Sequence, residues 1–108
     1  MTDVKEFGPI DLDTNVNNAV TASFSCLGST LITAYVIGDT GAHANHRVVI
    51  QISPNDGGLS GIDWFRVGDN MDGDKATATY VGAADSVRFK VVTAEGAPST
   101  CKIYAVAI

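Results

Sequence analysis

The sequence predicts an all-β protein: an antiparallel two-sheet sandwich of about seven strands, with jelly-roll-like or immunoglobulin-like topology. Three observations support this prediction. Apolar residues recur at every second position in short runs, turn residues such as Gly, Pro, Asn and Asp separate these runs, and helical periodicity is weak throughout. The length of 108 residues fits one domain with a modest core.

The start of the chain differs from the rest. Residues 1–17 are polar, rich in Asn and Asp, and contain Pro9. We therefore expect residues 1–17 to form an N-terminal arm or a loosely docked segment, and residues 18–108 to form the single sandwich domain. An arm of this kind is suited to contacts with a neighbouring subunit.

Four strands are expected in the first part of the sandwich. Residues 20–24 alternate apolar and small polar side chains, whereas residues 30–37 are apolar on both faces. A strand that is apolar on both faces is typical of a central position or of coverage by another subunit. Residues 48–53 alternate again, and the turn Pro54–Gly58 is expected to join them in a hairpin to a strand at 62–67.

The second half contains the remaining predicted strands. An acidic turn over residues 68–73 precedes a strand at 76–81, and a turn over residues 95–99 precedes a final strand at 100–108 that is apolar on both faces. We expect that final strand to be held in a sheet or an interface.

The clearest strand is residues 86–91. Its apolar side chains are expected in the core and its polar side chains in water. The first set is Val87, Phe89 and Val91, and the second is Ser86, Arg88 and Lys90.

The charge of the chain disfavours two classes of partner. The formal net charge is -5, and the seven Lys and Arg residues form no basic run. We therefore expect neither nucleic-acid binding nor attraction to an anionic membrane surface. Because no apolar run is long enough to span a bilayer and the first residues show no hydrophobic signal region, we expect residence in a cytosol.

Cys26 and Cys101 are the two cysteines. In a chain without an export signal, we expect them to be reduced and buried as small hydrophobic residues. Pairing after release from a cell stays open if the two lie on facing strands.

Two histidines, His43 and His46, have a spacing that can serve a metal ion. Two ligands do not complete a site, because structural zinc takes four ligands and catalytic zinc takes three protein ligands. The other soft ligands are two cysteines far away in the sequence, so we expect an exposed loop and no metal. A site on the threefold axis of an oligomer is the alternative.

The acidic segment Asp69–Asp74 is similar to a calcium-binding loop but differs at key positions. Met71 stands where an oxygen ligand belongs, Asp74 where the glycine belongs, and Tyr80 where the bidentate Glu belongs. A solvated turn is the expected structure. Calcium shared with a second loop that contains Asp56 or Asp63 stays open.

No catalytic constellation is evident. Gly58-Leu59-Ser60-Gly61 is one residue short of a nucleophile elbow and lacks the strand-to-helix context of that motif. We expect the protein not to be an enzyme and to use no cofactor.

The aromatic residues suggest an interaction surface instead. If Phe65 and Val67 point inward, Trp64 and Arg66 lie on the opposite face, where they would be typical of an interface anchor or a sugar platform; the other register would bury Trp64. The candidate interface residues are Trp64, Arg66, Tyr35, Tyr104 and Ile108.

Two segments carry a resemblance to a known group of proteins. Residues 49–58 followed by Asp63-Trp64, and the pair of segments 84–91 and 103–106 around Gly96 and Pro98, are similar to patterns in small bacteriophage virion β-sandwich proteins. The residues 59–62 depart from that pattern as an insertion, and the N-terminal polar segment is longer.

The resemblance implies a protein that decorates or cements a capsid, assembled in the host cytoplasm and located in the virion. It further implies the major capsid protein or other virion subunits as partners, and a homo-oligomer, most simply a trimer. A head-fibre or tail accessory protein and a carbohydrate-binding module with Trp64 or the tyrosines as stacking platforms are the alternatives.

Overall fold

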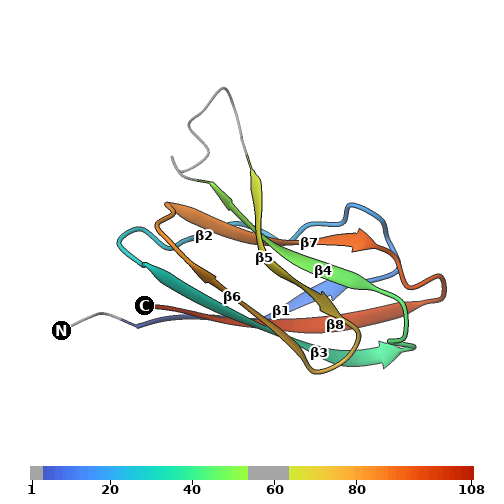
Figure 1. Cartoon of the computed structure of the whole chain (residues 1–108). Helices are drawn as coiled ribbons and strands as arrows, with labels where there is room; N and C mark the ends of the chain where they lie inside the picture. Colours follow the sequence, from blue (N-terminus) through green and yellow to red (C-terminus); the bar gives the residue numbers. More distant parts are fainter. Residues whose placement is uncertain (1–3, 54–63) are drawn as a thin grey trace.

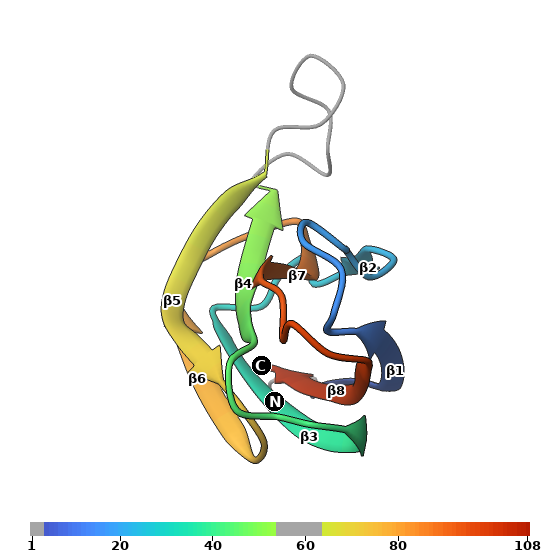
Figure 2. The same ribbon diagram turned by 90° about the vertical axis from the view of Figure 1, so that its right-hand side faces the viewer.

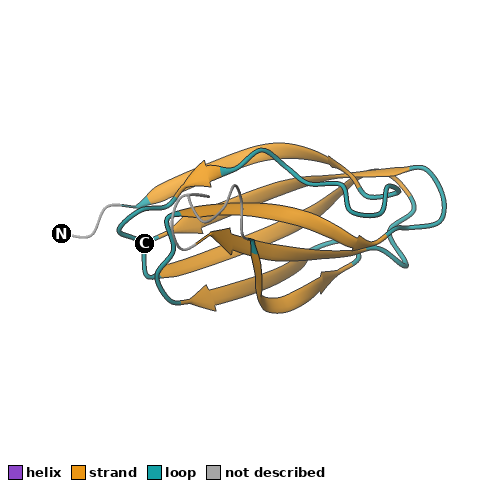
Figure 3. Ribbon diagram, turned by 90° about the horizontal axis from the view of Figure 1, so that it is seen from above, coloured by secondary structure: helices purple, strands orange, loops and turns teal. Residues whose placement is uncertain are grey.

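The computed structural model of the protein describes residues 4–53 and 64–108. In this part of the chain there are eight strands and no helix, and the strands form two stacked four-stranded sheets (Figures 1 and 3). The all-β sandwich prediction is therefore confirmed, with one strand more than expected. The strands are β1 (Lys5–Asp13), β2 (Phe24–Ser25), β3 (Leu31–Gly41), β4 (Arg47–Ser53), β5 (Phe65–Asp72), β6 (Ala76–Val81), β7 (Ser86–Thr93) and β8 (Ser99–Ala107).

Each sheet is antiparallel throughout. We call the sheet with strand order β1-β8-β3-β6 sheet A, and the sheet with order β2-β7-β4-β5 sheet B. The sheets meet along one side, where β5 and β6 lie next to each other and the turn at residues 73–75 carries the chain from sheet B to sheet A (Figure 2). The acidic turn expected at residues 68–73 is therefore shifted, because β5 continues to Asp72.

The additional strand lies in the segment that the sequence predicts to be an arm or a loosely docked segment. Strand β1 pairs antiparallel with β8, with Leu12 opposite Cys101, and Leu12 is buried in the core. The register shifts between Phe7 and Ile10, so the period-two alternation is interrupted at Gly8-Pro9. Because the alternation breaks at Gly8-Pro9, the sequence pattern does not indicate this edge strand.

The strand expected at residues 20–24 is mostly irregular. Only Phe24 and Ser25 form strand β2, and Val20 makes an isolated bridge to Lys90. The segment still follows β7, because the amide of Thr21 donates to the carbonyl oxygen of Phe89 at 3.0 Å.

The core fills the space between the sheets. Sheet B contributes Val48, Ile50, Ile52, Met71, Val87, Phe89 and Val91 to the core. Sheet A contributes Leu12, Ile32, Ala34, Val36, Ala78, Cys101, Ile103, Ala105 and Ala107. The prediction for β7 is confirmed at its three apolar positions. It is wrong for Ser86, which is buried because it lies between Ser25 of β2 and Ser53 of β4.

Some predictions cannot be placed. The turn Pro54–Gly58, Ser60 and the acidic residues Asp56 and Asp63 lie outside the described residues. The described residues hold no helical segment of the length and apolarity that crossing a membrane requires.

Candidate functional site

The outer face of sheet A exposes several large apolar side chains. Because Ile32, Ala34 and Val36 of β3 point into the core, the residues between them point outward. We call the outward set on β3, β6 and β8 the tyrosine face. It consists of Leu31, Tyr35, Ile37, Val81, Tyr104 and Val106.

The two tyrosines form the centre of this face. Tyr35 lies directly opposite Tyr104 of β8 on one side and opposite Thr77 of β6 on the other. Tyr35 is 44% exposed, Tyr104 37% and the neighbouring Ile37 41%. Adjacent exposed aromatic and aliphatic side chains on one sheet are typical of a surface that is covered by a partner.

A shallow groove lies at this point of the face. It has a volume of about 560 Å³, and Lys75 is the one charged residue among those that line it. The lining residues are Tyr35, Val36, Ile37, Lys75, Ala76, Thr77 and Tyr104. The groove is therefore an apolar recess with a cation at its edge.

One end of the tyrosine face is charged. Lys102 Nζ lies 2.7 Å from Asp11 Oδ1 and 3.9 Å from Asp39 Oδ2. The hydrogen bond to Asp11 raises the pKa of Lys102, so Lys102 stays protonated at neutral pH. The face thus combines an apolar centre with a polar margin, as protein interfaces do.

Trp64 and Arg66 lie on the other side of the molecule. Phe65 pairs with Ile52, Arg66 pairs with Gln51 and Val67 pairs with Ile50, so the register that places Arg66 on the outer face of sheet B is the observed one. The guanidinium of Arg88, on that outer face, lies over the Trp64 ring at 4.4 Å.

The candidate interface residues are therefore divided between two faces. Tyr35 and Tyr104 lie together on sheet A, and Ile108 continues their alternation at the end of β8, where its backbone exchanges hydrogen bonds with Leu31. Arg66 belongs to sheet B, and Trp64 directly precedes β5 of that sheet. Ile37 lies in the segment that is apolar on both faces, but neither Ile37 nor Val81 is among the candidate interface residues, because the outward face of a strand becomes known only with the register.

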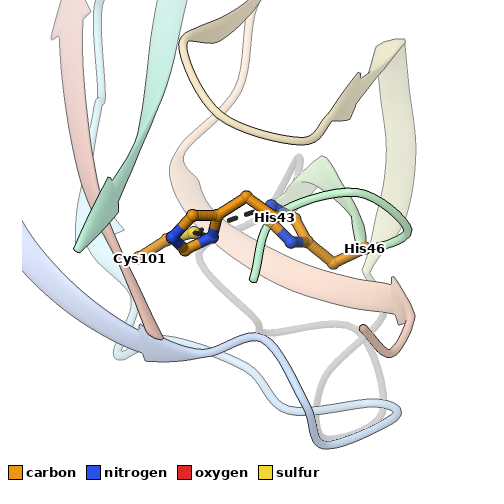
Figure 4. Close-up of side chains that lie close together, drawn as sticks. All are labelled: His43, His46 and Cys101. Atoms are coloured by element: carbon orange, nitrogen blue, oxygen red, sulfur yellow. Dashed lines mark hydrogen bonds between the residues drawn. The ribbon is translucent and has the colours of Figure 1, made fainter. Parts of the chain in front are cut away.

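The histidine pair is not an exposed loop, as the sequence suggested. His46 is fully buried and His43 is half-buried. Both imidazoles approach the thiol of Cys101, although 55 residues or more separate them from it in the sequence. Figure 4 shows these three side chains pointing toward one another.

A buried carboxylate holds His46. Glu95, in the loop between β7 and β8, has Oε1 3.0 Å from His46 Nδ1, and it accepts hydrogen bonds from the amides of Asn45 and His46. The hydrogen bond from the Asn45 amide, helped by His46, lowers the pKa of Glu95 to about 2. Glu95 is therefore an ionised acceptor at neutral pH.

Both cysteines are free and buried, as predicted. Burial raises the pKa of the Cys101 thiol, the hydrogen bond with Thr14 opposes this, and the charges of Asp74, Glu95 and Asp39 raise it further. Cys101 is thus a protonated thiol unless a cation lies close to it.

The acidic residues after Asp69 do not converge in the described part of the chain. Asp72 forms an ion pair with Arg47 at 3.4 Å, whereas Asp74 accepts a hydrogen bond from the amide of Gly38 at 2.7 Å. The carboxylate of Asp72 therefore contacts β4 and that of Asp74 contacts β3.

Comparisons with known proteins describe the fold. No family model and no curated protein matches the chain. The SPBc2 prophage-derived protein YomS has a similar structure, with a TM-score of 0.59, 8% identity and coverage of 99% of this chain and 96% of YomS. The Triatoma virus empty capsid is similar with a TM-score of 0.57, 8% identity and coverage of 97% of this chain and 86% of that chain.

A carbohydrate-binding domain has the same type of fold. Chitosan-binding module 1 of a chitosanase/glucanase from Paenibacillus sp. IK-5 has a TM-score of 0.52 and 20% identity, covering 89% of this chain and 72% of the module. At such identities these likenesses show a shared β-sandwich and nothing about activity.

Proposed function

We propose that the protein is a structural protein of a bacteriophage particle, a capsid decoration or cement protein whose tyrosine face is covered by another virion subunit. The observation that carries the proposal is the exposed apolar centre at Tyr35, Ile37 and Tyr104. The structural similarity to a prophage-derived protein and to a viral capsid supports a bacteriophage particle as the place where the protein acts.

The chemistry of the face suits adhesion. Tyrosine is enriched in protein interfaces, because its ring buries a large area and its hydroxyl group finds a polar partner. The pair Lys102–Asp11 at the margin adds charges that fix orientation rather than affinity. A non-catalytic role is part of the proposal, with assembly in the host cytoplasm and a final location in the virion.

Purified particles of the phage that encodes the chain provide the first test. Mass spectrometry of these particles should detect the protein at a fixed ratio to the major capsid protein. Light scattering of the isolated protein should show a homo-oligomer, which we propose to be a trimer. Absence from particles would contradict the proposal, whatever the oligomeric state.

A matched pair of variants tests the face itself. Tyr35→Glu places a charge at the centre of the tyrosine face, whereas Thr93→Glu places the same charge at an exposed position at the end of β7 in sheet B. Tyr35→Glu should abolish incorporation into particles while the circular dichroism spectrum stays unchanged, and Thr93→Glu should be incorporated normally. Equal incorporation of both variants would contradict the assignment of this face.

A carbohydrate-binding module is the second candidate. The adjacent Tyr35 and Tyr104 at an open groove could stack against sugar rings, and the fold is shared with a chitosan-binding module. A glycan array distinguishes the two functions: a specific signal lost in Tyr104→Ala would favour sugar binding, and no signal would count against it.

A further inference from the structure

The residues His43, His46 and Cys101 come together at one end of the sandwich. His43 and His46 lie in the connection from β3 to β4, and Cys101 lies on β8. The fold therefore joins a loop that links the two sheets to an inward-facing position of sheet A. The ligand atoms of the three residues all lie within 4.8 Å of one another.

The distances to sulfur match those around a tetrahedral zinc ion. Cys101 Sγ lies 3.7 Å from His43 Nδ1 and 3.6 Å from His46 Nε2. Zinc bonds of about 2.3 Å to sulfur and about 2.0 Å to nitrogen, at a tetrahedral angle, place the two ligand atoms about 3.5 Å apart. The imidazole of His43 is half-buried on a loop, and its ligand nitrogen lies within 4.8 Å of that of His46.

Each ring nitrogen of His46 lies close to a hydrogen-bond acceptor. Nδ1 lies 3.0 Å from the Glu95 carboxylate, and Nε2 lies 3.1 Å from the carbonyl oxygen of Gly73. A neutral imidazole carries one N–H, so it satisfies one of these two acceptors and turns a lone pair toward the other. With the Nδ1–H donated to Glu95, the lone pair of Nε2 is available to a metal ion.

Glu95 occupies the position of the outer carboxylate in many metal sites. Histidine ligands usually donate their second N–H to a carboxylate or carbonyl group, which fixes the tautomer and directs the other nitrogen toward the metal. The contact from His46 Nδ1 to buried Glu95 has this form and leaves Nε2 near both the carbonyl oxygen of Gly73 and the sulfur of Cys101.

The charges around the cluster favour a cation. Asp74 and Asp39 add negative charge near Cys101 to that of Glu95. Gly38 packs against the His43 ring so closely that a Cβ atom there would lie 2.6 Å from its Cδ2 atom. A glycine at this position is what allows the ring to lie in the cluster.

From this arrangement we propose that His43 Nδ1, His46 Nε2 and Cys101 Sγ bind one Zn²⁺ ion, with Glu95 as the positioning residue for His46. The Cys101 thiol releases its proton to solvent as the bond from Sγ to zinc forms. Three protein ligands leave a fourth position for water or for a group from outside the chain. The ion would tie β8 to the connection between the two sheets.

A titration with Co²⁺ provides the test, because Co²⁺ replaces zinc in tetrahedral sites and absorbs light. The reduced, metal-free protein should bind one equivalent of Co²⁺ and show both a thiolate-to-cobalt charge-transfer band in the near ultraviolet and strong visible bands. Zn²⁺ should displace the Co²⁺ and raise the thermal midpoint. A wild-type protein without the charge-transfer band would overturn the proposal.

Variants assign the ligands. His43→Ala changes a half-buried loop residue and should remove the bands at one equivalent of Co²⁺ without altering the circular dichroism spectrum. Cys101→Ser should remove the charge-transfer band, whereas Cys26→Ser changes the other buried cysteine and should leave it intact. Glu95→Gln should keep the bands but weaken Co²⁺ binding about 10- to 100-fold. Unchanged binding in His43→Ala, or loss of the band in Cys26→Ser, would contradict the assignment.

Discussion

The guanidinium carbon of Arg88 lies 4.4 Å from the centre of the Trp64 ring, and Arg88 Nε donates a hydrogen bond to Gln51 Oε1 at 2.8 Å. Arg88 therefore connects the start of β5 to β4 across the outer face of sheet B. We expect Arg88→Ala to destabilise the protein by about 1–2 kcal/mol, because it removes a cation–π contact and a hydrogen bond to a buried amide. Urea denaturation followed by tryptophan fluorescence measures this loss.

Lys90→Ala is the control for Arg88→Ala. Lys90 lies two residues further along β7, so its side chain shares the face but is not placed over the indole. Its removal should change the free energy of unfolding by less than about 0.5 kcal/mol. Equal effects of the two substitutions would contradict the stacking of Arg88 on Trp64.

The same substitution on the two faces of sheet A tests which side is the core. Ile103 of β8 is fully buried, whereas Ile37 of β3 lies on the tyrosine face. Ile103→Val should cost about 0.5–1.5 kcal/mol, because it leaves a small cavity. Ile37→Val should cost less than about 0.5 kcal/mol in the isolated protein. A larger loss for Ile37→Val, measured by urea denaturation, would mean that this face is already covered.

Local alternation was enough to predict the sandwich. In β7 the apolar positions Val87, Phe89 and Val91 face the core, as period two requires. The burial of Ser86 was predicted wrongly, because alternation within one strand does not show that β7 lies between β2 and β4. Edge strand β1 was missed because its register shifts at Gly8-Pro9.

The two candidate sites differ in how far the sequence reveals them. Tyr35 and Tyr104 were identified as surface aromatics, yet their adjacency depends on the pairing of β3 with β8. The approach of Cys101 to His43 and His46 depends on sheet order as well as strand pairing, because it joins a loop to a strand more than half the chain away. No local pattern carries that information.

Substitutions at Gly41 and Gly28 distinguish the cost of backbone strain from the cost of steric overlap. Both have positive φ angles, +80° at Gly41 and +87° at Gly28, but only at Gly41 would an added Cβ atom overlap the carbonyl oxygen of Pro98. Gly28→Ala should cost about 1–2 kcal/mol from the left-handed conformation alone. Gly41→Ala should cost at least about 1 kcal/mol more. Equal losses on urea denaturation would contradict the close approach of β3 to the loop before β8.

Glu95 should make the stability of the protein depend on pH in the acid range. Its pKa falls from 4.5 to about 2 in the folded protein, chiefly because the Asn45 amide donates a hydrogen bond to the carboxylate. A group with a lowered folded pKa binds protons more readily when unfolded, so its stabilising contribution is complete above pH 4.5 and is lost as the pH falls toward 2. Thermal midpoints of the metal-free protein at a series of pH values measure this loss.

Glu95→Gln identifies the group responsible for this loss. The amide keeps the size of the side chain but accepts more weakly from the Asn45 amide and cannot ionise. The thermal midpoint of Glu95→Gln should therefore lie below that of the wild type at pH 7, and the difference should shrink as the pH falls from 4.5 toward 2. Asp69→Asn, at an exposed position of β5, should follow the wild-type curve. A difference between Glu95→Gln and the wild type that stays constant down to pH 2 would show that packing, rather than the charge of Glu95, stabilises this end of the sandwich.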